Sequence, residues 1–398
     1  MSLLDTPRAN RLHIGVYGKR NVGKSSLVNA VTGQSISVVS DVPGTTTDPV
    51  YKAMELHPVG PVVFIDTAGL DDIGDLGGLR VGKTREAAQK TDVAIVVFAD
   101  EPDVEAEWVA DLERRGVPVV AVVNKADELA DPAALVAAIK RELRLDAVLV
   151  SARTGHNVTA VRDAIVAALP DDEPVSITGE LAQPGDLVLL VMPQDIQAPK
   201  GRLILPQVQT LRDLLDKKCL VMSCTTDKLT ETLAALSRPP ALIITDSQVF
   251  PIVHAAKPAE SRLTSFSVLF ASYKGDITAF VDGASGIDGL TATSRVLIAE
   301  SCTHAPLEED IGRIKIPALL RKRFGDSLTV DMRTGPGLLE DLGSYDLVIH
   351  CGGCMFNRRH VLSRIDEAQQ QGVPITNYGV TIAKLSGILD SIALPAPR

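Results

Sequence analysis

The stretch Gly18-Lys19-Arg20-Asn21-Val22-Gly23-Lys24-Ser25 decides the fold of the first part of the chain. It matches the pattern G-x-x-x-x-G-K-[ST] and directly follows a strand-like apolar run, Leu12–Tyr17, which is the setting that this pattern requires. In such a loop, backbone N–H groups surround the phosphates of a nucleotide at the N-terminus of a helix. The sequence therefore predicts a strand, a phosphate-binding loop and a helix. The residues expected to contact the nucleotide here are Gly18, Asn21, Val22, Gly23, Lys24, Ser25 and Ser26.

Two of these residues have separate predicted roles. Lys24 is expected to reach the β- and γ-phosphates, and the Ser25 hydroxyl to ligate Mg²⁺. A second motif, Asp66-Thr67-Ala68-Gly69, follows the strand-like run Val62–Ile65. There the Asp66 carboxylate can hold the magnesium shell, and the Gly69 N–H can contact a γ-phosphate.

A third motif selects the base. Asn124-Lys125-Ala126-Asp127 follows the strand-like run Val117–Val123. The Asp127 carboxylate can accept hydrogen bonds from the ring N–H and the exocyclic amine of guanine, a pair of donors that adenine lacks. Backbone N–H groups of Ser151-Ala152-Arg153 are expected to complete the base pocket. The expected ligands are therefore GTP or GDP with Mg²⁺.

Together these motifs resemble the translation-factor-related GTPases, especially the subgroup of the tRNA-modification GTPase and Era, over roughly the first 170 residues. The resemblance gives Asn124, Lys125 and Asp127 the base-reading role. It makes Pro43-Gly44-Thr45-Thr46-Thr47-Asp48 the first switch segment, in which Thr46, or alternatively Thr47, ligates Mg²⁺. The expected catalytic residues are Lys24, Thr46, Asp66 and Gly69.

Leu70 stands where Ras-type proteins carry a water-orienting Gln. In the subgroup that the chain resembles, this gap is filled by K⁺ held partly by an Asn of the phosphate loop, here Asn21. The resemblance therefore implies slow GTP hydrolysis that K⁺ accelerates.

Composition excludes several classes of protein. The chain has 398 residues, a net charge of −10 and 45% hydrophobic residues, which excludes disordered and fibrous classes. The acidic balance argues against nucleic acid as the main partner. Apolar runs such as Val93–Ala99 are too short for a membrane span, and the N-terminus lacks a secretory pattern, so we expect a cytoplasmic protein without a membrane partner.

Alternating strand-like and helical runs predict an α/β fold with three domains. The expected order is a P-loop domain over residues 1–172, a linker over 173–184, a small α/β domain over 185–264 and a doubly wound α/β domain over 265–398. Predicted strands of the last domain include Arg295–Ala299 and Asp346–His350, and one of its predicted helices is Leu338–Leu342.

Three of the five cysteines lie in two short motifs, Cys302-Thr303-His304 and His350-Cys351-Gly352-Gly353-Cys354. Each motif follows a predicted strand, so both can meet at the carboxyl edge of one sheet. Three thiolates can hold an iron-sulfur cluster, whereas Cys and His together can also close a zinc site, and the residue types leave both options open. A redox disulfide between Cys351 and Cys354 would not explain Cys302. Cys219 and Cys224 are interpreted as structural thiols.

A GTPase domain followed by these two motifs resembles the HydF family, the maturation GTPases of iron-only (FeFe) hydrogenases. The resemblance implies a dimerisation domain in the middle of the chain and a 4Fe-4S cluster held by Cys302, Cys351 and Cys354, with His304 and His350 as further candidate ligands. It also implies a homodimer that carries a di-iron precursor, the radical-SAM maturases HydE and HydG as partners, and apo FeFe-hydrogenase as the recipient. The alternative is a K⁺-dependent GTPase of the tRNA-modification or ribosome-assembly kind with a structural zinc site.

Overall fold

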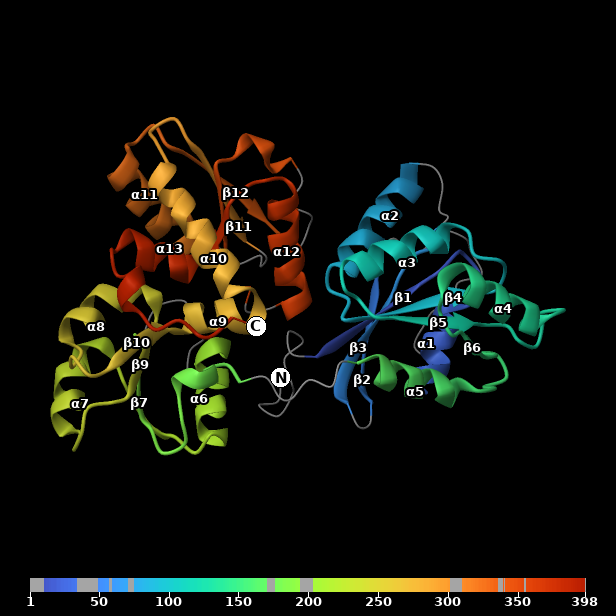
Figure 1. Cartoon of the computed structure of the whole chain (residues 1–398), viewed down its shortest axis with the longest axis horizontal. Coiled ribbons are helices and arrows are strands. Elements are labelled where there is room, and N and C mark those ends of the chain that lie inside the picture. The colour runs from blue at the N-terminus through green and yellow to red at the C-terminus, as the bar shows by residue number, and fades with distance from the viewer. Residues whose placement is uncertain are drawn as a thin grey trace. The chain divides into compact units, whose positions relative to one another are not determined.

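The computed structural model describes residues 11–33, 49–56, 59–70, 75–169, 176–193, 203–300, 310–335, 339, 341–353 and 356–397, with only the backbone described at 75–80. The chain forms two compact units, Met1–Glu173 and Pro174–Arg398 (Figure 1). None of the helices in these ranges combines the length and the apolar character needed to cross a bilayer.

The first unit is built on a six-stranded sheet with the order β2-β3-β1-β4-β5-β6. Its strands are β1 (Leu12–Tyr17), β2 (Val50–Leu56), β3 (Gly60–Asp66), β4 (Val93–Phe98), β5 (Val119–Val123) and β6 (Val148–Leu149). Only β2 runs antiparallel to its neighbour. Central strands such as β4 are runs of Val, Ile and Ala that are buried along their whole length, as expected where helices cover both faces of a parallel sheet.

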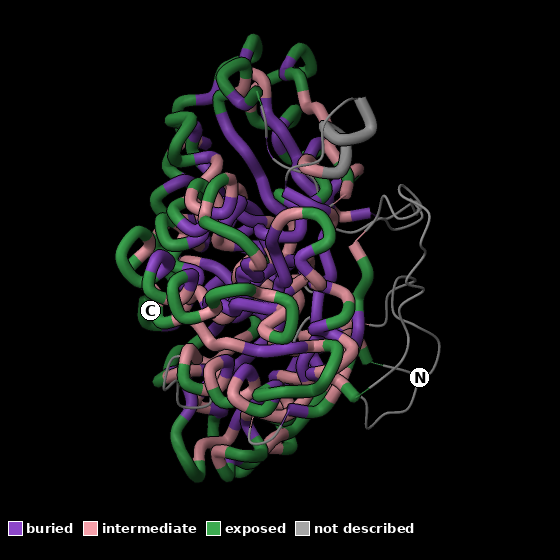
Figure 2. Tube along the Cα trace, turned by 90° about the vertical axis from the view of Figure 1, so that its right-hand side faces the viewer, coloured by how far each residue is buried: buried purple, intermediate pink, exposed green. Residues whose placement is uncertain are grey.

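Helices cover both faces of this sheet. They are α1 (Lys24–Thr32), α2 (Asp75–Ala88), α3 (Val104–Arg114), α4 (Pro132–Leu143) and α5 (Val158–Ala168). Apolar residues of α1 and α5 pack on one face, and apolar residues of α3 and α4 pack on the other. The chain alternates between buried stretches and exposed turns, as Figure 2 shows. This arrangement brings the carboxyl ends of the parallel strands to one edge of the sheet.

The second unit contains two four-stranded parallel sheets, with the orders β10-β9-β7-β8 and β12-β11-β13-β14. The strands are β7 (Leu187–Val191), β8 (Leu220–Cys224), β9 (Leu242–Thr245), β10 (Arg262–Ser265), β11 (Arg295–Glu300), β12 (Thr329–Thr334), β13 (Leu347–His350) and β14 (Ile375–Asn377). The helices are α6 (Leu205–Asp216), α7 (Leu229–Ala235), α8 (Phe250–Ala256), α9 (Phe266–Lys274), α10 (Ile277–Ala284), α11 (Ile316–Phe324), α12 (Arg358–Gln370) and α13 (Tyr378–Leu385).

Helix α9 joins the two sheets of the second unit. Phe266 and Phe270 belong to the core under the β7–β10 sheet, whereas Val268 and Ala271 belong to a core that extends into the β11–β14 sheet. Residues at both ends of α9 are therefore buried, and the two sheets share hydrophobic packing.

The predicted fold class is confirmed: an α/β chain that begins with a P-loop domain. The predicted domain limits within residues 174–398 stay predictions. The predicted helix at Leu338–Leu342 is wrong within the described residues, because Leu342–Ser344 forms a single 3-10 turn that follows Asp341 in a left-handed conformation.

Candidate functional site

The loop between β1 and α1 requires glycine at two positions. Gly18 has φ 143°, and a Cβ atom there would lie 2.4 Å from the Val97 carbonyl oxygen. Gly23 has φ 91° and caps α1, and a Cβ atom there would lie 2.3 Å from Asn124 Nδ2. Both positions combine a backbone conformation that favours glycine with a close approach of other atoms. The loop is therefore specified by the two fixed glycines of its sequence pattern.

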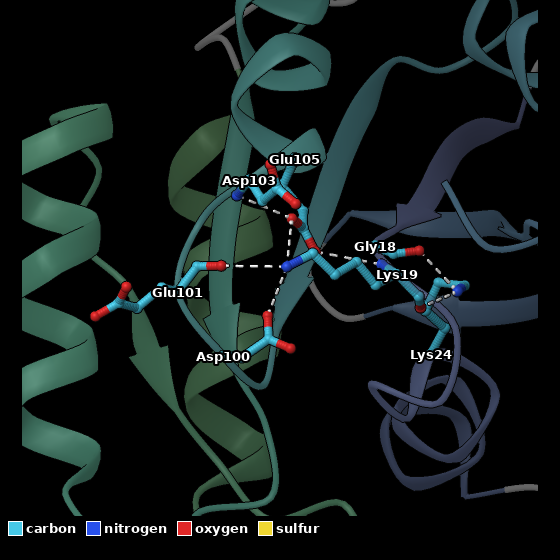
Figure 3. Close-up of polar contacts among 7 residues, drawn as sticks. All are labelled: Gly18, Lys19, Lys24, Asp100, Glu101, Asp103 and Glu105. Carbon is cyan, nitrogen blue, oxygen red and sulfur yellow. Dashed lines mark hydrogen bonds and ion pairs between the residues drawn. The ribbon is translucent and has the colours of Figure 1, made fainter. Parts of the chain in front are cut away.

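Lys24 closes this loop on itself. Its buried ammonium group donates hydrogen bonds to the carbonyl oxygens of Gly18, at 2.8 Å, and Lys19, at 2.7 Å (Figure 3). These are the donors that would meet the β- and γ-phosphates of a bound nucleotide.

Acidic residues that follow β4 form hydrogen bonds with Lys19 of the phosphate loop. Lys19 Nζ donates to Asp100 Oδ1 at 2.7 Å, and the Lys19 backbone N–H donates to Glu105 Oε1 at 3.3 Å (Figure 3). Burial lowers the pKa of Lys19, but the hydrogen bond to Asp100 and the charge of Glu105 outweigh this effect and raise the pKa. Glu105 is fully buried at the start of α3. Neither carboxylate was found by sequence reasoning, because no local pattern links residues that lie more than 80 positions from Lys19.

Ser25 and Asp66 form the candidate magnesium site. The Ser25 hydroxyl donates to Asp66 Oδ2 at 2.5 Å, which brings together two of the predicted ligands. Burial raises the pKa of Asp66, and Ser25, Lys24 and Lys52 oppose this shift. Asp66 Oδ1 is buried and has no hydrogen-bond partner among the described residues. A carboxylate oxygen left in this state next to a hydroxyl group fits Mg²⁺, which prefers oxygen ligands.

Leu70 occupies the position where Ras-type proteins carry a water-orienting glutamine. Leu70 is buried among apolar residues that include Tyr17 and Ala88, and its N–H donates to the Gly18 carbonyl oxygen at 3.2 Å. Its side chain therefore packs in the core. Gly69 lies between Asp66 and Leu70 at the edge of the phosphate loop, whereas Thr46 and Thr47 lie outside the described residues.

A cavity of about 510 Å³ lies beside the phosphate loop. Its size is in the range of small-molecule sites. It is lined by Gly23, Ser26, Asn29, Ala30, Gly33, Asn124, Lys125, Asp127, Glu128, Ala152 and Arg153. The structure therefore brings the phosphate loop, the Asn124–Asp127 motif and the Ser151–Arg153 motif to one cavity, as predicted for a nucleotide.

Asn124 links the loops that surround this cavity. Its Nδ2 donates to the Val22 carbonyl oxygen at 2.9 Å, and its Oδ1 accepts from the Ala152 N–H at 3.0 Å. The side chain is buried, and its two bonds tie the phosphate loop to the Ser151–Arg153 motif.

Asp127 faces the cavity as a charged acceptor. A hydrogen bond from Ser151 lowers the pKa of Asp127, and the Arg153 guanidinium adds to this effect. Arg153 forms ion pairs with Asp127 and Glu128. The ionised Asp127 carboxylate can accept hydrogen bonds from the ring N–H and the exocyclic amine of guanine. For this, Arg153 must leave the carboxylate or bind it together with the base.

The cysteine site lies in the second unit, where β11 and β13 are neighbours. Ala299 pairs with His350 across the two strands, and the Cys351 N–H donates to the Ala299 carbonyl oxygen at 3.0 Å. The Cys351 thiol is half-buried. Cys302, His304 and Cys354 lie outside the described residues.

His350 is enclosed at the end of β13. It is fully buried, and its Nδ1 donates to the Cys351 carbonyl oxygen at 2.6 Å. Burial lowers the pKa of His350 to about 3, and the nearby Arg364 charge contributes to this shift. His350 is therefore neutral and orients the Cys351 peptide.

Polar groups that the sequence did not reveal surround this strand edge. Glu300 Oε2 accepts from Arg313 at 3.0 Å, and Glu300 Oε1 accepts from the Tyr378 hydroxyl at 3.4 Å. Gly312 makes room for this arrangement, because a Cβ atom there would lie 2.0 Å from the Tyr378 hydroxyl oxygen. The edge that presents Cys351 is thus polar and ordered.

The two remaining cysteines lie in the β7–β10 sheet region. Burial raises the pKa of both Cys219 and Cys224, and Cys219 Sγ donates to the Gln183 carbonyl oxygen at 3.3 Å. Raised thiol pKa values favour the inert protonated form, which agrees with structural roles.

The first unit has the fold of a P-loop GTPase, and its phosphate loop, the Ser25–Asp66 pair and the Asn124–Asp127 motif lie around one edge of the sheet. A family model described as "50S ribosome-binding GTPase" matches residues 13–125. Models described as "Hydrogen maturase F dimerization domain" and "Hydrogen maturase F tetramerization domain" match residues 177–275 and 278–394, more than half of the chain between them. The chain belongs to the hydrogen maturase F (HydF) family.

Individual relatives match part of the chain. The tRNA modification GTPase MnmE of Endomicrobium trichonymphae is 34% identical over 162 residues, which cover 39% of this chain and 35% of that protein. GTPase Der of Wolinella succinogenes is 39% identical over 127 residues, which cover 30% of this chain and 26% of that protein. The chain thus spans about a third of the length of these curated relatives or less. A crystal structure of Era with MgGDPNP and 16S ribosomal RNA is 19% identical, with a TM-score of 0.36, and covers 56% of this chain and 97% of that one.

Proposed function

We propose that the first unit binds and hydrolyses GTP with Mg²⁺, slowly and with stimulation by K⁺. The observation that carries this proposal is the Ser25–Asp66 pair with its unsatisfied carboxylate oxygen, beside a cavity lined by the base-reading motif. In the reaction, a water oxygen attacks the γ-phosphorus, the bond to the β–γ bridging oxygen breaks, and GDP and phosphate leave. The protein contributes mainly positioning and charge stabilisation.

Each predicted catalytic residue has a defined task in this scheme. Lys24 exchanges its two carbonyl acceptors for phosphate oxygens, which are stronger because they are charged. Asp66 and Ser25 would hold Mg²⁺, Thr46 would add a further magnesium ligand, and the Gly69 N–H would contact the γ-phosphate. When bound, Mg²⁺ would neutralise part of the charge that develops on the phosphates.

Asn21 is the proposed K⁺ ligand. It has φ 59° within the phosphate loop, and the buried Leu70 offers no substitute for a water-orienting glutamine. The test is phosphate release by the full chain in K⁺ and in Na⁺ buffers, with Asn21→Gly as the variant, since glycine tolerates this backbone conformation. We expect K⁺ stimulation in the wild type and its loss in Asn21→Gly. Equal wild-type rates in both salts would contradict the proposal.

The second unit carries a 4Fe-4S cluster through Cys302, Cys351 and Cys354 in this proposal. Support comes from membership of the hydrogen maturase F family and from the position of Cys351, which directly follows β13, the neighbour of the strand that leads to Cys302. The cluster supplies an iron that three thiolates leave open to a further ligand. Glu300, Arg313 and Tyr378 keep this strand edge ordered and polar.

The whole protein then acts as a maturation scaffold. It carries a di-iron precursor received through the radical-SAM maturases HydE and HydG and delivers it to apo FeFe-hydrogenase, with the GTPase cycle controlling partner association. A reducing compartment such as the cytoplasm suits the free thiols of Cys219 and Cys224.

The cluster proposal is tested on anaerobically purified full-length protein by iron and zinc analysis with electron spin resonance before and after reduction. We expect iron and a reducible cluster, lost in Cys302→Ala, Cys351→Ala and Cys354→Ala while GTP turnover is kept. The matched control is Cys219→Ala, which removes a buried thiol from the core under the β7–β10 sheet. Stoichiometric zinc without iron would contradict this proposal and favour the alternative of a structural zinc site.

The second unit also provides a surface for a homodimer. Strand β8 lies at the edge of its sheet, and Leu220 and Met222 on it are 57% and 43% exposed. Val208 and Leu215 of the neighbouring helix α6 are exposed as well. An edge strand with apolar side chains is a surface that pairing with another chain protects. We assign the second copy of this chain to it, in line with the dimerisation family model that matches these residues.

A further inference from the structure

Arg364 is a buried cation in the second unit. It lies on α12 and is 2% exposed, which places it among the largest fully buried side chains. Its Nη2 donates to the Gly335 carbonyl oxygen at 2.7 Å, and its Nε has no hydrogen-bond partner among the described residues. Within the same residues, no carboxylate forms an ion pair with it at 4 Å or less. A guanidinium group without an anion is rarely buried, because its desolvation is then uncompensated.

The surroundings of Arg364 show which part of the sheet its guanidinium group faces. Gly335 directly follows β12, and its N–H donates to the Glu300 carbonyl oxygen at 2.8 Å, at the end of β11. The Cys351 N–H donates to Ala299, which is also near the end of β11. The guanidinium and the Cys351 thiol therefore stand at the same carboxyl edge of the sheet.

Helix α12 also packs against the loop that follows Cys351. A Cβ atom at Gly353 would lie 2.9 Å from Val361 Cγ2, one helical turn before Arg364. Burial lowers the pKa of Arg364, and negative charge at Glu367 and at Cys351 opposes this shift. Together with the packing of Val361 against Gly353, this places Arg364 on the side of α12 that faces the end of β13.

A purely structural role does not require this charge. One hydrogen bond to Gly335 would tie α12 to the end of β12, and a neutral amide could supply it. A five-donor cation is useful where a larger anion with several acceptor atoms is held. A cubane core held by three thiolates is such an anion, and its reduction adds further negative charge.

We propose that Arg364 is a positioning residue that provides the counter-charge and a hydrogen-bond donor for an anionic metal–thiolate group bound through Cys351. This inference rests on the proposed function of the second unit. Hydrogen bonds and charge around the sulfur atoms tune the reduction potential of such groups. A fixed cation stabilises the reduced, more negative state, so its removal lowers the potential.

The experiment is a redox titration, followed by electron spin resonance, of the reconstituted full-length protein. The variants are Arg364→Gln, which can keep the bond to Gly335, Arg364→Met, which fills the site with an apolar chain, and Arg364→Lys, which keeps the charge. At a fixed solution potential, the ratio of reduced to oxidised cluster should fall about threefold or more in the Gln and Met variants and much less in the Lys variant. Arg323→Gln is the control, because it removes an exposed arginine whose charge is paired with Asp288.

The outcomes separate the two proposals. Wild-type protein that binds zinc without iron overturns the cluster proposal, and the role of Arg364 falls with it. A wild-type cluster whose reduced fraction is unchanged in Arg364→Gln overturns the Arg364 inference alone. If Arg364→Gln does not fold, Arg364→Met decides, since replacing a buried charge by an apolar side chain often preserves stability.

Discussion

Asn124 is predicted to connect the base pocket to the phosphate loop energetically. Asn124→Ala removes the hydrogen bonds to the Val22 carbonyl oxygen, at 2.9 Å, and from the Ala152 N–H, at 3.0 Å. Each loss leaves a backbone group without its partner, which costs about 1–3 kcal/mol for a fully buried group. Water that enters the adjacent cavity can form hydrogen bonds with these two backbone groups. We therefore take a total cost of about 2–3 kcal/mol for the loss of both bonds. At 1.4 kcal/mol per tenfold change, the affinity for GDP should fall about 30- to 150-fold.

The assay is isothermal titration of the full chain with GDP and Mg²⁺. The matched control is Asn157→Gly, because the Asn157 side chain makes a single exposed hydrogen bond, to the Leu149 carbonyl oxygen at 2.9 Å, and glycine accepts its φ of 57°. We expect the control to bind GDP within about twofold of the wild type. If Asn124→Ala binds within threefold of the wild type, the reasoning that these bonds preorganise the pocket is refuted.

Three further perturbations test other parts of the structure. Arg153→Ala should raise GDP affinity about two- to fivefold, because an exposed ion pair that competes for Asp127 is worth up to about 1 kcal/mol, and titration at low and high salt measures it. Burial raises the pKa of Tyr17, so the folded state keeps a proton that the unfolded state releases above about pH 10. Above about pH 10, the free energy of unfolding of the first unit should therefore fall by up to about 1.4 kcal/mol per pH unit. Urea unfolding of Tyr17→Phe should show a smaller dependence of this free energy on pH. Leu220→Asp should give a monomer in light scattering with GTP turnover kept, whereas Ile252→Asp, at an equally exposed apolar residue on α8, should leave the oligomer intact.

The nucleotide site was predictable because its chemistry is encoded locally. Gly18 and Gly23 adopt conformations that favour glycine, and Asp66 and Asn124 directly follow strands. Each motif therefore contains both its functional atoms and the backbone signal that places them. Parallel topology then brings the motifs to one edge without further information.

Features that depend on packing between distant segments were not predictable. Arg358, Arg359 and Arg364 belong to one helix and look alike in the sequence, yet only the packing of α12 shows that Arg364 faces inward. Glu105 contacts the phosphate loop across 86 positions. Helices α8 and α10 were also missed, since seven or eight residues are too few for a clear helical period.

Both sites retain a buried polar atom whose charge indicates the ligand it requires. Among the described residues, Asp66 Oδ1 and Arg364 Nε have no hydrogen-bond partner. An unsatisfied carboxylate oxygen next to a hydroxyl calls for a cation, whereas an unsatisfied guanidinium nitrogen near a thiol calls for an anion. Such atoms destabilise the ligand-free fold, and a ligand that satisfies them binds the native state alone and stabilises it by mass action. Mg²⁺–GDP should therefore raise the unfolding temperature of the first unit, and an anionic metal–thiolate group that of the second.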